Sequence, residues 1–202
     1  MTIVVTGGIG SGKTSVCSIL SERYGFPVYE ADLKVKMLYD NVPGLVEAVE
    51  RAAGRTLRDS DGRFVPSLLA EVIFEDPVKL NEVEQIVFPA LKNDYSKWLD
   101  THSDCSHHIF ESATILEKQQ FDGFGDIVLL VDAPVSLRLE RAVSRDGSER
   151  DRIVSRMNNQ TLMNRLSCGD SDQRVNHVIW NVGSYSELVS KVDDFVINYR
   201  LT

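Results

Sequence analysis

The chain has 202 residues, 43% of them apolar and 26% charged, and its 22 basic against 30 acidic residues give a net charge of −8. This composition is close to that of average globular domains and excludes collagen-like, low-complexity and wholly disordered chains. No apolar run approaches the roughly 20 residues that a membrane-spanning helix needs, and the N-terminal residues lack the basic segment of a signal peptide. We therefore expect a cytoplasmic protein that does not associate with a membrane.

Charge and cysteine usage exclude further classes of protein. An acidic chain is a poor generic binder of nucleic acid, because that affinity comes mostly from basic side chains on phosphates. The three cysteines, Cys17, Cys105 and Cys168, are odd in number and widely spaced. This spacing argues against a disulfide framework and against a zinc site of the usual kind.

The apolar pattern predicts strands that alternate with helices along the chain. Residues 2–6 are expected to form a buried strand, and a second strand is expected to start at Val28. Strands are predicted again over 108–113, 126–131 and 177–182. Helices are predicted over 13–24, 32–39, 44–53, 67–74, 78–99 and 135–145, with a last one opening at the capping box Ser184-x-x-Glu187. This alternation predicts an α/β fold with a parallel sheet of about five strands.

Residues 7–14 read GGIGSGKT and match the phosphate-binding pattern G-x-x-x-x-G-K-[ST]. Glycines let successive amide groups turn inward around a phosphate, and a helix beginning at the lysine points its positive end at the anion. Lys13 would place a cation on the β- and γ-phosphates, and the Thr14 hydroxyl could bind Mg²⁺. The sequence therefore predicts a nucleotide site, whose residues are Gly8, Gly10, Ser11, Gly12, Lys13, Thr14 and Ser15.

Two other nucleotide-binding classes fit less well. A dinucleotide fingerprint would need its third glycine where the chain has Lys13. A GTPase would need a guanine-reading Asn-Lys-x-Asp motif, which the sequence lacks. Asp59-x-x-Gly62 resembles a switch motif but follows no predicted strand, so we interpret it as a turn.

Asp32 lies just past a predicted strand, at the sheet edge where open α/β folds bind ligands, and Glu111 lies at the end of the next one. Asp32 could accept the proton of an attacking hydroxyl, or it could cap the following helix. Glu111 could orient Mg²⁺ or a water molecule, or it could be an ordinary solvated strand end. The sequence leaves both pairs of alternatives open.

Half of the fourteen arginines lie between residues 138 and 165, a stretch that contains no lysine. Guanidinium groups suit phosphate oxygens and stack on adenine, so this stretch is predicted to form a lid that closes over ATP. A solvated helical face paired with neighbouring acidic residues is the alternative. The seven residues are Arg138, Arg141, Arg145, Arg150, Arg152, Arg156 and Arg165.

The chain resembles the dephospho-CoA kinase family in several motifs. The loop at residues 6–14 is similar to the family's own loop, and PVYEAD at residues 27–32 is similar to its PVIDAD. Further resemblance lies in Asp61-Gly62 with residues 72–77, in residues 131–134, Arg145-Asp146, Arg156 with Gln160, and residues 178–183. On the acceptor side the chain departs from the family, since Phe88 stands where the family has histidine.

The resemblance implies a P-loop kinase fold of three layers, with residues 1–33 and 106–202 as the nucleotide-binding core and a lid over about 138–165. Residues 34–105 would be a helical insertion that binds the acceptor. The implied reaction phosphorylates the ribose 3′-hydroxyl of dephospho-CoA with ATP and Mg²⁺, in a monomer or weak homo-oligomer. The alternatives are a kinase for another nucleoside or nucleotide, or a catalytically weak ATP-binding paralogue.

The loop motif, the positions at strand ends and the resemblance together give each candidate residue an expected role. Lys13, Asp32 and Arg141 would be catalytic. Arg145, Arg156 and Asn181 would join the loop residues in binding the nucleotide. Thr14 and Glu111 would bind the metal ion.

Overall fold

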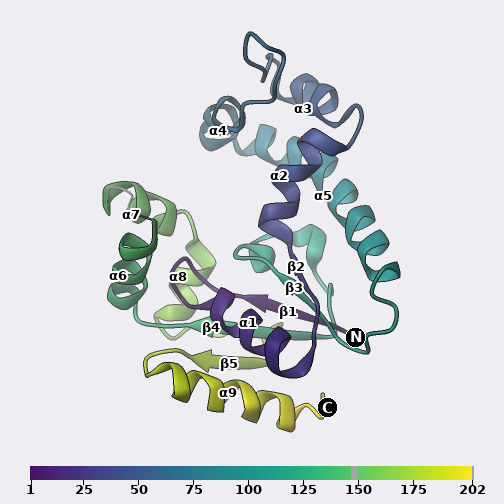
Figure 1. The fold of residues 1–202 in the computed structure, drawn as a ribbon. Helices are drawn as coiled ribbons and strands as arrows, with labels where there is room; N and C mark the ends of the chain where they lie inside the picture. The colour runs from purple at the N-terminus through teal and green to yellow at the C-terminus, as the bar shows by residue number, and fades with distance from the viewer. Residues whose placement is uncertain (147–149, 202) are drawn as a thin grey trace. The chain divides into compact units, whose positions relative to one another are not determined.

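The computed structural model describes residues 1–146 and 150–201 and divides into two units (Figure 1). The sheet unit comprises residues 1–30 and 102–202, and the helical unit comprises residues 31–101. The predicted lid range of about 138–165 includes residues 147–149, which lie outside the described residues. No helix in the described part of the chain is long and apolar enough to cross a bilayer.

The sheet unit contains one parallel five-stranded sheet in the order β2-β3-β1-β4-β5, which confirms the predicted fold class. The central strands consist mostly of apolar residues and are buried on both faces, as parallel sheets require. The strands are β1 (Thr2–Thr6), β2 (Val28–Glu30), β3 (His108–Glu111), β4 (Ile127–Asp132) and β5 (His177–Trp180).

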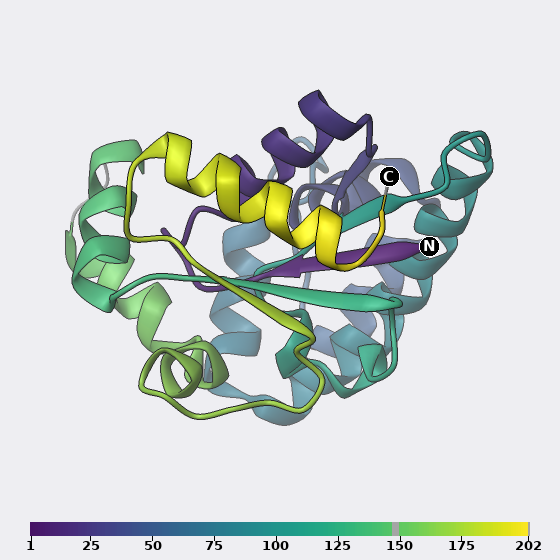
Figure 2. The ribbon, with the colours of Figure 1, turned by 90° about the horizontal axis from the view of Figure 1, so that it is seen from below.

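Helices α1 (Lys13–Tyr24) and α9 (Tyr185–Asn198) cover one face of this sheet (Figure 2). Their apolar stripes pack with alternate strand residues such as Ile3, Leu129 and Ile179 in one buried cluster. The opposite face carries Phe110, whose ring lies 4.8 Å from that of Phe124 in an edge-on arrangement. Two short 3₁₀ helices, η1 (Ile115–Glu117) and η2 (Gln119–Phe121), precede Phe124.

The predicted lid forms three helices, α6 (Val135–Asp146), α7 (Arg150–Asn158) and α8 (Thr161–Ser167). Helices α6 and α7 share a small apolar cluster of Ala142, Ile153 and Met157, against which Ile9 packs. Ile9 lies between β1 and α1, in the predicted phosphate-binding loop. The packing therefore joins this loop to the arginine-rich helices.

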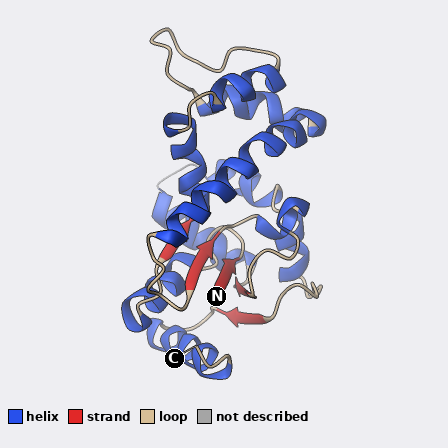
Figure 3. Cartoon of the chain, turned by 90° about the vertical axis from the view of Figure 1, so that its right-hand side faces the viewer, coloured by secondary structure: helices blue, strands red, loops and turns tan. Residues whose placement is uncertain are grey.

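The helical unit contains no strand among its described residues (Figure 3). Its helices are α2 (Ala31–Asn41), α3 (Leu45–Ala53), α4 (Pro66–Glu75) and α5 (Pro77–Asp100). Asp59 accepts hydrogen bonds from the amides of Asp61 and Arg63, and Gly62 has a φ of 80°, so the Asp59-x-x-Gly62 segment is the predicted turn. Val49, Leu57, Val83 and neighbouring apolar residues form a core within this unit.

Candidate active site

The glycine-rich loop connects β1 to α1, as its motif requires. Gly10 and Gly12 have φ values of 76° and 102°, in the left-handed region that favours glycine. Gly12 is also the residue that precedes the first turn of α1, and no side chain caps that turn. Unpaired amides at a helix N-terminus attract anions, and a chain of left-handed glycines turns further amides toward the same point. The loop therefore has the geometry of a phosphate site.

Lys13 and Glu111 form an ion pair in the structure. The Lys13 Nζ lies 3.7 Å from the Glu111 Oε1, and the two side chains are only 10% and 15% exposed. Sheet register explains the pairing, because Glu111 is the partner of Val5 on the neighbouring strand, near the start of the loop. The fold thus brings together Lys13, which was predicted to bind phosphate, and Glu111, which was predicted to bind the metal ion.

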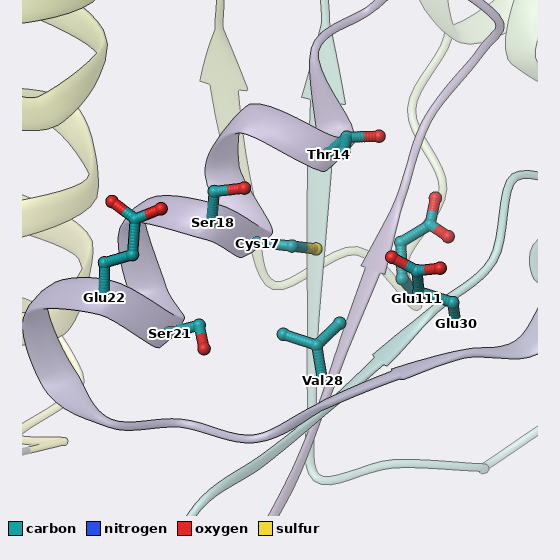
Figure 4. A pocket seen from close by; sticks show the side chains of 8 residues that line it. All are labelled: Thr14, Cys17, Ser18, Ser21, Glu22, Val28, Glu30 and Glu111. Atoms are coloured by element: carbon teal, nitrogen blue, oxygen red, sulfur yellow. The ribbon is translucent and has the colours of Figure 1, made fainter.

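A hollow beside this ion pair collects oxygen ligands from three elements. Thr14 of α1, Glu30 of β2 and Glu111 of β3 all line it. Glu30 and Glu111 are register partners on adjacent strands, and Figure 4 shows their carboxylates next to each other. Glu30 was missed by sequence reasoning, although it occupies the carboxyl end of a predicted strand.

Cys17 also lines this hollow and points toward the two glutamates (Figure 4). Burial and the nearby charge of Glu111 raise the pKa of the Cys17 thiol far above its usual range. The residue is therefore a neutral thiol at physiological pH and is not an activated nucleophile.

A second hollow lies at the N-terminus of α1, on the side of β5. It is lined by Gly12, Ser15, Arg141, Asn181, Gly183, Ser184, Tyr185 and Leu188. The Arg141 Nη1 donates to the Asn181 carbonyl at 3.1 Å, and the Asn181 Nδ2 donates to the Ser11 carbonyl at 2.8 Å. A Cβ at Gly12 would lie 2.2 Å from the Asn181 Nδ2, so this approach requires glycine. The structure thus gathers Ser15, Arg141 and Asn181 at one place.

The remaining candidate residues lie on helices. Asp32 is the second residue of α2, in the helical unit. It lies in the first turn of this helix, where a carboxylate interacts favourably with the helix dipole. Arg145 and Arg156 are in the last turns of α6 and α7, and both are exposed.

Two residues that sequence reasoning grouped with the lid or its motifs contact the phosphate-binding loop. Gln160 is 4% exposed, and its Oε1 accepts a hydrogen bond from the Ile9 amide at 2.9 Å. Arg138 was expected to face ATP with the other lid arginines, but it is 0% exposed, and its Nε donates to the Ile9 carbonyl at 3.1 Å. The sequence alone did not indicate that Arg138 is buried while other arginines of the same stretch are exposed.

Comparison with known proteins places this site in a family. A family model described as dephospho-CoA kinase matches residues 1–186. The dephospho-CoA kinase of Porphyromonas gingivalis is 37% identical over 177 residues, which cover 87% of this chain and 85% of that protein. The dephospho-CoA kinase of Bacteroides fragilis is 33% identical over 181 residues, which cover 90% of this chain and 84% of that protein.

A crystal structure from Thermus thermophilus matches the fold with a TM-score of 0.80 at 26% identity, and the match covers 100% of this chain and 98% of that one. The family match spans nearly the whole chain and includes the glycine-rich loop and the hollow beside Lys13. Members of this family are kinases that catalyse the last step of coenzyme A biosynthesis. The chain therefore belongs to the dephospho-CoA kinase family.

Proposed function

We propose that the protein transfers the γ-phosphoryl group of ATP to the ribose 3′-hydroxyl of dephospho-CoA and releases CoA and ADP. The observation that carries the proposal is the phosphate-binding loop, with Lys13 held beside Glu111 at the carboxyl end of a parallel sheet. Enzymes of this reaction class accelerate phosphoryl transfer mostly by positioning and charge neutralisation, and the loop supplies both.

The function is tested by ADP release from ATP in the presence of dephospho-CoA, measured against a panel of nucleosides and nucleotides. We expect turnover with dephospho-CoA and formation of CoA. Turnover with another acceptor only would assign the loop to a different small-molecule kinase. ATP binding without transfer to any acceptor would identify a catalytically weak paralogue.

The nucleotide is proposed to lie across the loop. The amides of Gly8 to Thr14 would bind the β- and γ-phosphates, and Lys13 would neutralise their charge as it shifts toward the leaving group. The hollow lined by Ser15, Arg141 and Asn181 would take the nucleoside, since it adjoins the N-terminus of α1. Tyr185, which is 62% exposed at this hollow, offers a ring face for the base.

Arg141 lines the proposed nucleoside hollow. Replacing it with glutamine is expected to raise the KM for ATP about tenfold and to lower kcat less, because a charged hydrogen-bond donor is lost at the nucleoside hollow. Steady-state kinetics with ATP as the varied substrate measure this split. Arg23→Gln is the matched control, since Arg23 lies on the surface and pairs with Asp193. A fall in kcat with an unchanged KM would place Arg141 on the transferring phosphoryl group instead.

The hollow beside Lys13 fits Mg²⁺. Its donor set is the Thr14 hydroxyl with the carboxylates of Glu30 and Glu111, and hard oxygen ligands of this kind suit the ion. No group of three or more His, Cys, Asp or Glu residues that could hold a metal ion occurs in the described chain. Mg²⁺ does not need one, because it is usually held by one or two carboxylates, water and substrate phosphates. When bound, the ion would offset the negative charge of the phosphates and hold them in a fixed orientation.

The remaining roles follow from position in the chain and from the family. Asp32 is proposed to orient the 3′-hydroxyl and to accept its proton during attack on the γ-phosphorus. The helical unit is proposed to bind the rest of the acceptor, and Arg145 and Arg156 are proposed to contact the nucleotide phosphates. A cytoplasmic location and a monomeric or weakly associating state complete the proposal, and light scattering tests the second point.

A further inference from the structure

A buried guanidinium group lies against the phosphate-binding loop. The Arg138 side chain is 0% exposed, and it comes from α6. Its Nε donates to the Ile9 carbonyl at 3.1 Å, and its Nη1 lies 2.8 Å from the Ser167 Oγ and 3.5 Å from the Asp132 Oδ1. One side chain therefore connects the loop, the last residue of α8 and the carboxyl end of β4.

The loop glycines permit this close approach. A Cβ at Gly8 would lie 1.9 Å from the Arg138 Nη2, and a Cβ at Gly10 would lie 2.0 Å from the Arg138 carbonyl oxygen. Any side chain at either position would have to displace α6 or its arginine. The two glycines that flank Ile9 thus leave room for Arg138 as well as freedom for the backbone.

Glycines on both sides leave the Ile9 peptide groups with few local restraints, so hydrogen bonds must set their direction. The Ile9 amide donates to the Gln160 Oε1 at 2.9 Å, and the Ile9 carbonyl accepts from Arg138. The Ile9 side chain packs against the apolar cluster of α6 and α7. The tip of the loop is therefore held through its amide, its carbonyl and its side chain.

Burying a cation beside the loop costs free energy, because the charged group loses its hydration. Burial lowers the pKa of Arg138, and the nearby carboxylate of Asp132 opposes this shift. Asp132 is itself 3% exposed and accepts a further hydrogen bond from the Ser167 hydroxyl at 3.0 Å. The Arg138 Nη2 makes no hydrogen bond within the described residues. Hydrophobic residues would fill such a site at lower cost, so the arginine is better explained by what it does to the loop.

We propose that Arg138 is a positioning residue for phosphoryl transfer: its Nε fixes the Ile9 carbonyl, and with it the direction in which the neighbouring loop amides face the ATP phosphates. The proposal rests on the loop being the phosphate site, as proposed above. It assigns Arg138 no contact with substrate. The residue acts through the backbone of Ile9.

Two variants isolate the hydrogen bond to Ile9. In Arg138→Gln the side-chain Nε2 occupies the same place along the chain as the arginine Nε and can donate to the Ile9 carbonyl. In Arg138→Met no donor is left. Both variants remove the charge and leave Asp132 without its cation, so these losses cancel when the two are compared. Arg23→Met, at a surface arginine, is the matched control for the loss of a guanidinium group.

We expect kcat/KM for ATP to be about tenfold or more lower in Arg138→Met than in Arg138→Gln. In the methionine variant the buried Ile9 carbonyl loses its hydrogen-bond donor, and the loop amides are no longer held in the direction of the phosphates. The KM for dephospho-CoA is expected to be the same in both variants. Affinity for the fluorescent analogue 2′/3′-O-(N-methylanthraniloyl)-ATP should fall in parallel. A general loss of structure would change the KM values for both substrates, and the glutamine variant would show it as strongly as the methionine variant.

Equal kcat/KM values for the two variants, with both folded, would overturn the proposal, as would an equal rise in the KM values for ATP and for dephospho-CoA. If neither variant is folded at the assay temperature, the same comparison is made with Asp132→Asn added to each, which neutralises the unpaired carboxylate. Binding of the ATP analogue keeps the two proposals separate. If the wild-type protein does not phosphorylate dephospho-CoA, but Arg138→Gln binds the ATP analogue more tightly than Arg138→Met, the acceptor is refuted and the role of Arg138 is retained.

Discussion

Replacing Lys13 with alanine is expected to lower kcat about 10²–10³-fold while the fold is retained, because a charge-stabilising donor is lost where negative charge develops in the transition state. The Lys13 Nζ is held near the Glu111 carboxylate, in a side chain that is 10% exposed. A cation in so shielded a place interacts strongly with phosphate charge. Steady-state kinetics with dephospho-CoA measure the loss, and circular dichroism with thermal unfolding shows that the variant is folded.

Lys191→Ala is the matched control for Lys13→Ala. Lys191 belongs to α9 and donates to the Trp180 carbonyl, so its loss removes a lysine from the sheet unit without touching the loop. Near wild-type turnover is expected from this control. A folded Lys13→Ala protein with wild-type kcat would contradict the assignment of the loop to the transferring phosphate.

Replacing Asp32 with asparagine is expected to lower kcat about 10²–10⁴-fold, the range over which a positioned general base contributes. Asparagine has nearly the same shape and can still accept a hydrogen bond, but it cannot take the proton of the attacking hydroxyl. The KM for ATP is expected to stay the same, because the proposed nucleotide contacts are on other residues. Single-turnover measurements with saturating ATP test the chemical step directly.

Asp40→Asn provides the control on the same helix, near the C-terminal end of α2. It removes one carboxylate from α2 and is expected to leave kcat unchanged. Wild-type turnover in Asp32→Asn would leave the residue with its favourable place in the first turn of α2 as its main role.

Much of the fold could be predicted because its signals are local. The continuous apolar run at residues 127–131 marked a fully buried strand, and Ser184-x-x-Glu187 marked the start of the last helix. Helices α4 and α5 begin one residue earlier than predicted, at Pro66 and Pro77. Proline has no amide hydrogen and a fixed φ, so it suits the first helical position and belongs to the helix that it opens.

The sites were partly predictable for the same reason. The loop is contiguous in sequence, so Lys13 and Thr14 could be identified by spacing alone. Glu30 joins them only through sheet register, which pairs it with Glu111 across more than seventy positions of chain. The burial of Arg138 could not be predicted, because it depends on the approach of α6 to two glycines. Strand register and long-range packing depend on residues that are far apart in the sequence, so no local sequence pattern predicts them.

The pairing of Glu30 with Glu111 has a consequence for how this sheet is balanced. Two like charges placed opposite each other on adjacent strands weaken the strand pair, and Lys13 can neutralise one of them. Neutral or oppositely charged residues at these two positions would make the strand pair more stable. Mg²⁺ at the proposed site would offset the repulsion between these two carboxylates, so the β2–β3 strand pair is expected to be more stable with the ion bound than without it.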